Sequence, residues 1–475
     1  MTPPGAGTGT PIAGGTTRRP TVAAPRPLLR VGDVSSLVIG IVVGAGVFSI
    51  PSVVAANAGS ATDVMLAWGA GGLLSLVGAM CYAELATSQP DAGGEYHFLR
   101  LAYGEKIAFL FAWARLTVIP TGSIALLAFI FGDYASQLWR IGGAYSASVH
   151  AALAICLLTL LNILGLRSGK GTQNLLTALQ LAGVAAIILS GLLLAPAGGT
   201  LAVLSAAPGE TQWGLVMIFV MLAYGGWNEA AYVSSEVQRP ARNIPRGLLW
   251  SLGGITVLYL LMNWAYLRVL GLDRMGQSEA VAAEMMAALP WEYGAGLISA
   301  AVAIAAVTSA NATILMASRT TYALGRDAPL FAMLGRWHPR LDAPVVALVV
   351  QATIALLLVL LGTLTREGFA TMVEYTAPVF WLFFLLTGVS LFVLRHRMPG
   401  LARPFRVPLY PLTPLVFCAT CAYLLYASLR HTGVGALVGL GVLATGVLVL
   451  LVGGSGVIPA QQPLRIDRSR EGETR

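Results

Sequence analysis

Long apolar segments alternate with short polar ones along most of this chain. Each apolar segment holds about 20 residues, the length with which an α-helix crosses roughly 30 Å of hydrocarbon. The pattern therefore predicts an all-α membrane protein with twelve transmembrane helices. Their expected positions are residues 33–57, 62–88, 105–138, 149–166, 172–195, 211–236, 247–270, 291–322, 342–363, 371–394, 408–428 and 433–452.

Two of these segments, the first and the sixth, are interrupted by glycine. The interruptions read GIVVGAGVF at residues 40–48 and LAYGGWNE at residues 222–229. Glycine weakens a helix, and in lipid a bare backbone is tolerated only where it lines a cavity enclosed by protein. A single Gly-x-Gly is more often a packing face between helices. The pair, however, occupies matching positions in a five-plus-five inverted repeat, which predicts two broken helices around a transporter site.

The backbone groups freed by two such breaks predict the chemistry of the ligand. The segment Gly44–Gly46 would leave N–H groups unpaired beside the positive end of a half-helix, which suits a carboxylate. The segment Tyr224–Gly226 would end a half-helix whose carbonyl oxygens suit an ammonium group or a small cation. Together the two breaks favour a zwitterion with the backbone of an α-amino acid.

Composition and charge agree with a membrane location. Of the 475 residues, 56% are hydrophobic and only 11% are charged, which is too apolar for an ordinary soluble protein. The net charge of +8 could indicate a nucleic-acid partner, so its distribution decides. With the N-terminus in the cytoplasm, 23 of the 29 Lys and Arg residues fall on the cytoplasmic side and 5 in outside loops. The basic charge thus predicts a multi-pass protein of the cell inner membrane with both termini cytoplasmic, and no nucleic-acid partner.

The ends of the chain differ from its middle. Residues 1–30 are rich in Pro, Gly and Thr and are expected to form a disordered cytoplasmic tail, as are residues 456–475. Between them we expect a first inverted repeat at 31–195, a second at 211–397, and two further helices at 398–455.

Short motifs surround the two interruptions. The runs VGAGVF and AYGGWN occupy residues 43–48 and 223–228. Further motifs are GAMCYAEL at 78–85, GGEY at 93–96 and EVQRPARNIP at 236–245. Three shorter ones lie at or after the end of the eighth span: ASR at 317–319, RD at 326–327 and HP at 338–339. Spread over residues 33–400, these motifs resemble those of the amino acid–polyamine–organocation superfamily, and AYGGWN resembles its L-type amino acid transporter branch.

The resemblance implies a LeuT-like fold, with broken helices 1 and 6, two extra C-terminal helices, alternating access and a substrate site at the bilayer midplane. The residues that would bind the substrate carboxylate are Gly44, Ala45 and Gly46. The carbonyls that would bind its ammonium group lie near Leu222, Ala223 and Gly225. Asn228 stands where these relatives place an Asn near the substrate.

Three departures from the family pattern modify these expectations. Leu222 replaces a gating aromatic residue, so the gate is either weaker or supplied by Trp227. Gln180 stands where many sodium-independent relatives carry a Lys, so obligate sodium-independent exchange does not follow. The expected outside loop 139–149 lacks the Cys with which eukaryotic heteromeric members join a glycoprotein, so no disulfide-linked heavy subunit is expected.

Other polar residues inside the predicted spans are candidates for coupling or gating. Glu229 could accept a coupling proton, attract a basic substrate, or simply be paired within the bundle, for example with Arg115. In the eighth span the oxygen-bearing candidates for binding sodium or substrate are Thr308, Ser309 and Asn311. Hydrogen bonding of such hydroxyls to their own helix is the commoner alternative. Beyond a coupling H⁺ or Na⁺, no metal or cofactor is expected.

Enzyme and channel functions lack their characteristic residues. All five histidines lie at predicted span ends or in loops, and the chain contains no HExxH or GxSxG motif. No filter repeat or ring of pore-lining charges is visible either. The sequence therefore predicts a secondary active transporter of neutral L-amino acids. The alternative is a proton- or sodium-coupled carrier of cationic amino acids or polyamines.

Overall fold

The computed structural model describes residues 29–91, 93–164, 170–194, 209–290, 294–341, 343–365, 368–431 and 434–453. Apart from Leu29 and Arg30, both expected tails lie outside these residues. The helices of the first half are α1 (Val31–Val42), η1 (Ala45–Phe48), α2 (Ile50–Ala56), α3 (Ala61–Ser88), α4 (Glu95–Tyr103), α5 (Glu105–Thr117), α6 (Ile119–Leu138), η2 (Gly143–Tyr145), α7 (Ser146–Ile163) and α8 (Lys170–Leu193). Those of the second half are α10 (Trp213–Ala223), η3 (Trp227–Glu236), α11 (Pro240–Gln277), α12 (Val281–Ala287), α13 (Gly294–Asp327), η4 (Pro329–Phe331), α14 (Val345–Thr365), α15 (Gly368–Arg397), α16 (Leu412–Arg430) and α17 (Val434–Gly453).

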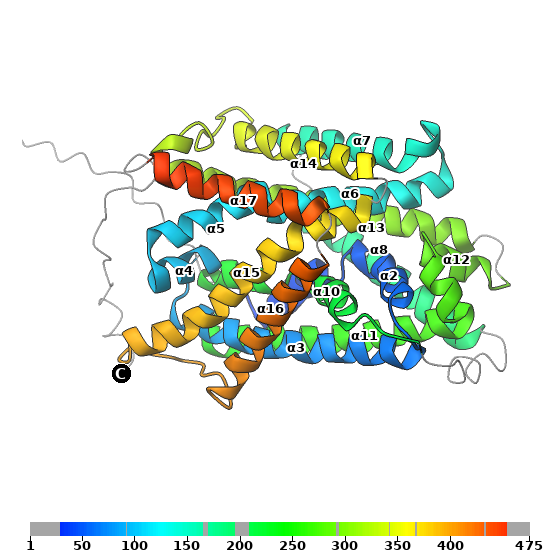
Figure 1. Ribbon diagram of the computed structural model, residues 1–475, viewed down its shortest axis with the longest axis horizontal. Helices are drawn as coiled ribbons and strands as arrows, with labels where there is room; N and C mark the ends of the chain where they lie inside the picture. The colour runs from blue at the N-terminus through cyan, green and yellow to red at the C-terminus, as the bar shows by residue number, and fades with distance from the viewer. Residues whose placement is uncertain are drawn as a thin grey trace, which may run out of the picture.

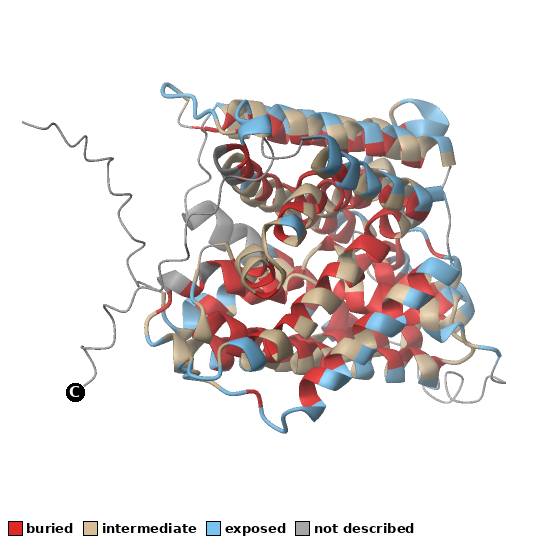
Figure 2. Cartoon of the chain, turned by 60° about the vertical axis from the view of Figure 1, so that its left-hand side comes forward, coloured by how far each residue is buried: buried red, intermediate tan, exposed pale blue. Residues whose placement is uncertain are grey.

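These helices form one bundle whose broken segments lie in its interior. In Figure 1, α3 and α11 run along one side of the bundle and α7 and α14 along the opposite side, with α2 and α10 between them. Buried residues gather inside the bundle, as Figure 2 shows. Large apolar side chains nevertheless remain exposed on its outer helices, among them Leu73, Trp250, Leu357 and Leu451. Exposed apolar surface on this scale is expected where lipid replaces water.

The predicted all-α membrane fold is confirmed, whereas the count of twelve spans stays a prediction. Within the described residues, nine helices are long and apolar enough to cross a membrane. Shorter apolar helices fall in the other three expected spans, at Val31–Val42, Ala178–Leu193 and Trp213–Ala223. Two of these three are the helices that the sequence predicts to be broken, and breaking shortens each piece.

Two local features were not predicted. The third expected span is interrupted at Val118, where α5 ends and α6 begins, because Pro120 supplies no N–H and its ring crowds the preceding turn. The expected loop after the second span contains the short helix α4, which starts at the buried Glu95.

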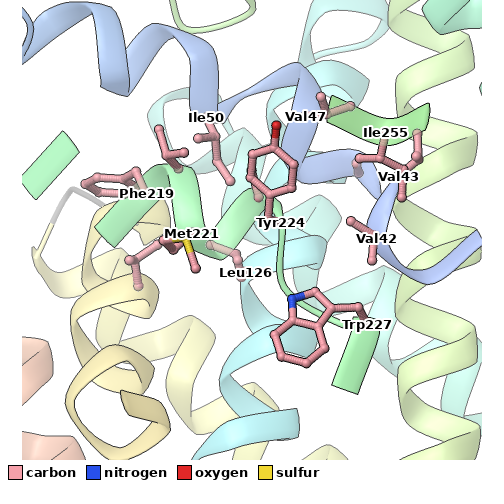
Figure 3. Close-up of a cluster of buried hydrophobic side chains, with 14 of the residues drawn as sticks. Val42, Val43, Val47, Ile50, Leu126, Phe219, Met221, Tyr224, Trp227 and Ile255 are labelled. Atoms are coloured by element: carbon pink, nitrogen blue, oxygen red, sulfur yellow. The ribbon is translucent and has the colours of Figure 1, made fainter. Parts of the chain in front are cut away.

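Both predicted breaks are present. The first helix stops at Val42, continues as the short 3₁₀ segment η1, and resumes as α2 at Ile50. The sixth stops at Ala223 and continues as η3, a 3₁₀ helix of 10 residues. The two breaks lie close together, since a Cβ placed on Gly226 would lie only 2.6 Å from Cγ2 of Ile41, in the last turn of α1 before the first break. Figure 3 shows side chains of both broken helices in one apolar cluster, with Tyr224 between them.

Candidate substrate site

The first break presents free backbone donors. The amide of Gly44 donates to the Val42 carbonyl at 2.7 Å, and the amide of Val47 donates to the Gly44 carbonyl at 3.4 Å. Among the described residues, the two amides between them, those of Ala45 and Gly46, make no hydrogen bond. These are the unpaired first-turn donors that a helix start always leaves, here held inside the bundle.

The second break presents backbone acceptors. The Leu222 carbonyl accepts from the Gly225 amide at 2.9 Å, and the Ala223 carbonyl accepts from the Tyr259 hydroxyl at 3.1 Å. A carbonyl oxygen has two lone pairs, so the Ala223 carbonyl keeps the capacity for a second donor, whereas the Leu222 carbonyl also accepts from the Tyr224 amide. The chain then turns at Gly226, whose φ of +106° is unfavourable for residues with a side chain.

One hydroxyl joins the two breaks. The oxygen of Tyr259 on α11 lies 2.8 Å from the Val42 carbonyl oxygen and 3.1 Å from that of Ala223. A phenol has a single proton, so it donates fully to only one of the two carbonyls at a time. The Tyr259 ring packs edge-on against Trp68 and tilted against Tyr224, which fixes its position. Sequence reasoning missed this residue, and a tyrosine inside the seventh predicted span was its only signal.

The predicted coupling residues divide into two groups. Gln180 is buried and its side-chain amide donates to the Val43 carbonyl, directly at the first break. The Oγ of Ser309 also faces this break, 3.6 Å from where a Cβ on Gly44 would lie, and has no hydrogen-bond partner among the described residues. Thr308 instead donates to the carbonyl of Ile304 in its own helix at 2.7 Å.

Asn311, the third of the eighth-span candidates, is also engaged away from the break. Its Oδ1 accepts a hydrogen bond from the side-chain amide of Asn162 at 2.7 Å. The structure therefore brings Gln180 and Ser309 together at the first break, and it places the polar groups of Thr308 and Asn311 in other hydrogen bonds.

The polar residues after the second break point into the protein. The side-chain amide of Asn228 lies 3.4 Å from a carboxylate oxygen of Glu95. Glu229 forms an ion pair of 3.2 Å with Arg115, the pairing that the sequence left as one alternative. Trp227 is buried in an aromatic cluster, with its ring 5.0 Å from that of Tyr82. In this conformation Asn228 and Glu229 already have partners from the chain itself.

Comparison with known proteins decides the family. The family model for amino acid permeases matches residues 29–452, which is nearly the whole chain. The chain belongs to the amino acid permease family. This result confirms the superfamily indicated by the motifs, and it identifies a multi-pass membrane transporter of amino acids and not an enzyme.

Curated relatives of this permease come from animals and bacteria. It is 31% identical to the b(0,+)-type amino acid transporter 1 of Mus musculus over 402 residues, covering 82% of this chain and 80% of the relative. It is 28% identical to the serine/threonine exchanger SteT of Bacillus subtilis (strain 168) over 414 residues, covering 85% and 92%. It is 29% identical to the large neutral amino acids transporter small subunit 2 of Mus musculus over 450 residues, covering 89% and 80%.

Proposed function

We propose that this amino acid permease carries neutral L-amino acids by alternating access, binding the carboxylate at the first break and the ammonium group at the second. The observation that supports this most directly is the proximity of the two breaks. The amides of Ala45 and Gly46 at the first break make no hydrogen bond among the described residues, and the second break offers the backbone carbonyls of Leu222, Ala223 and Gly225. A zwitterion satisfies both sets of groups without any charged side chain.

The geometry of Gly44 supports a ligand at the first break. Its φ of −85° is open to any residue, and a Cβ there would meet its nearest atoms at 3.5 and 3.6 Å. Neither backbone conformation nor internal packing therefore requires glycine at this position. A requirement for close approach by a bound carboxylate does explain it.

Two observations favour neutral substrates over cationic ones. Glu229, the acid that could attract a basic substrate, is compensated by the guanidinium of Arg115. Two relatives are also named for neutral substrates, one for serine and threonine and one for large neutral amino acids. The second candidate, a carrier of cationic amino acids or polyamines, rests on Glu229 keeping 21% of its side chain exposed.

For coupling, we propose that the carrier does not depend on sodium. The Gln180 amide donates to the Val43 carbonyl, which could otherwise accept from an ammonium group or coordinate a sodium ion, and it does so without charge. A coupling proton at Glu229 remains the candidate for active uptake. Replacing Glu229 by Gln should then flatten the pH dependence of uptake, measured between pH 5 and 8. An unchanged profile would remove Glu229 from this role.

The surroundings of the carrier follow from the same sequence features. We propose that it lies in the cell inner membrane with both termini cytoplasmic, supported by the distribution of Lys and Arg. We also propose that it works without a disulfide-linked heavy subunit. All four cysteines lie within helices α3, α7 and α16, and none falls in the loop where such a bond would form.

Uptake by purified protein in liposomes tests the proposal. Labelled serine, threonine, alanine and leucine should accumulate above protein-free liposomes, whereas arginine, lysine and putrescine should not. Uptake confined to the cationic compounds would establish the second candidate. Thermal stabilisation by an amino acid without any flux would instead indicate a receptor and contradict a carrier.

A further inference from the structure

Three charged side chains, two of them buried and one half-buried, meet beside η3, the segment that follows the second break. They are Glu95 at the start of α4, Arg115 on α5 and Glu229 on η3. Nη1 of Arg115 lies 3.2 Å from Oε1 of Glu229 and 3.9 Å from Oε2 of Glu95. Only 9% of the Arg115 side chain and 3% of the Glu95 side chain are exposed, so these charges depend on one another for compensation.

Neutral polar groups complete this cluster. The Tyr232 hydroxyl lies 3.0 Å from both Nη1 of Arg115 and Oε2 of Glu95, so it accepts from the first and donates to the second. The hydroxyl of Tyr82, on α3, donates to the other oxygen of Glu95. Glu95 thus collects donors from α3 and from η3, and it stands as the common acceptor between these elements.

The 3₁₀ geometry of η3 brings two of its side chains to the same place. In a helix with three residues per turn, positions i and i+3 are eclipsed. Glu229 and Tyr232 are spaced in this way and both contact Arg115, whose guanidinium also lies 4.8 Å from the centre of the Tyr232 ring. The contact therefore depends on the helix type of η3 as well as on its position.

We propose that Arg115 and Glu95 are positioning residues that hold η3 against α5, closing the site on the α4 side, and that this contact opens once in each transport cycle. The proposal rests on the proposed function, because alternating access requires the segments around the site to move relative to one another. The cluster joins a segment of the broken sixth helix to the third span. Arg115 and Glu95, which contact η3 from α5 and α4, are both buried in this structure.

The ion pair between Arg115 and Glu229 is weaker than another ion pair of this protein, as a contact that opens in each cycle requires. Glu84, another buried carboxylate, is held by Nε and Nη2 of Arg395 at 2.7 and 2.6 Å and by the Val407 amide at 2.6 Å. Such a bidentate ion pair with an additional backbone donor is typical of a contact that stays intact. Arg115 makes a single contact of 3.2 Å with Glu229, and its Nε has no partner among the described residues.

The test is Tyr232→Phe in the full-length protein, which removes the hydroxyl shared by Arg115 and Glu95 and keeps the ring. The matched control is Tyr103→Phe, since the Tyr103 hydroxyl donates at 2.8 Å to the Leu386 carbonyl and lies outside the cluster. We expect amide hydrogen exchange in residues 227–236 to accelerate about tenfold in Tyr232→Phe, with no change in the control. Glu229→Gln, a second and nearly isosteric variant, should act in the same direction.

A sided transport measurement accompanies the exchange experiment. Weakening the contact raises the population open toward α4, so the apparent affinity for substrate on that face should rise by up to about tenfold. The half-saturation concentration on the opposite face should change less than twofold. Inside-out and right-side-out vesicles give the two half-saturation concentrations separately.

Two results would overturn the proposal: exchange in residues 227–236 equal to that of Tyr103→Phe, or equal shifts of half-saturation on both faces. Failure of the proposed function gives a different result. Wild-type protein would then take up no neutral amino acid from either face, while the exchange measurement would still report whether the cluster holds η3.

Discussion

The two broken helices use glycine for different reasons. At the first break, Gly44 has an ordinary φ and room for a methyl group, and Gly46 would bring a Cβ to 3.2 Å from the flexible end of Ile50. At the second break, Gly226 has a φ of +106° and Ile41 fills the space of its missing Cβ, while a Cβ on Gly225 would lie 2.9 Å from the Leu222 carbonyl oxygen. The second break therefore needs glycine in order to fold, whereas folding does not require glycine at Gly44, where the proposed function assigns it to binding of the substrate carboxylate.

The same contrast appears in what holds each break. The first is secured by side chains of distant helices, with Gln180 on the Val43 carbonyl and Tyr259 on that of Val42. The second is secured largely by its own turn, since the amides of Gly225 and Glu229 bond carbonyls three residues earlier. Substitutions at the first break should thus affect binding, and substitutions at the second should affect stability.

Gly226→Ala should have the largest effect. Forcing a side chain into this φ costs about 1–3 kcal/mol, and overlap with Ile41 adds about 1–3 kcal/mol. We expect a marked fall in folded, monodisperse protein and in the midpoint of thermal unfolding in detergent. A variant that unfolds like the wild type would show that the second break tolerates a side chain. It would contradict the conclusion that only the second break needs glycine in order to fold.

Gly46→Leu should abolish transport, lowering uptake at least about 100-fold, because its side chain fills the place of the carboxylate. The protein should remain folded, with substrate-induced thermal stabilisation lost. Gly44→Ala is the milder companion, since its methyl group fits, and it should raise the half-saturation concentration while leaving the unfolding midpoint nearly unchanged. Persistent uptake by Gly46→Leu would place the substrate elsewhere.

Tyr259→Phe tests the link between the breaks. Losing one hydrogen bond is worth about 0.5–1.5 kcal/mol, so the apparent substrate affinity should fall by up to about tenfold. Tyr266→Phe is the matched control, because this tyrosine lies buried on the same helix and its hydroxyl has no partner among the described residues. Equal effects of the two substitutions would deny Tyr259 a specific role.

The smallest effect concerns sodium. With Gln180 supplying an uncharged donor to the first break, replacing Na⁺ by choline should change the initial rate of uptake less than twofold. A strong dependence on Na⁺ would instead make Ser309, the unpartnered hydroxyl facing this break, the candidate ligand.

Helical spans and their interruptions could be read from the chain because their causes are local. A run of about 20 apolar residues is long enough to cross a bilayer wherever it occurs, and glycine weakens a helix at its own position. The breaks at Gly44–Gly46 and Gly225–Gly226 were expected for this reason, as was the candidate zwitterion site. The interruption at Val118 has a local cause in Pro120 and was overlooked, whereas the helix type of η3 was not expected because packing of neighbouring segments influences it.

Contacts between helices depended on rotations and crossings that no local pattern specifies. Tyr259 reaches Val42 across 217 positions, Arg115 reaches Glu229 across 114, and Arg395 reaches Glu84 across 311. Adjacent residues of an α-helix are separated by a rotation of about 100°. An error of one residue in the predicted register of a helix therefore points a side chain away from its partner. Only the packed bundle could show that one tyrosine joins both breaks and that Glu229 is already paired.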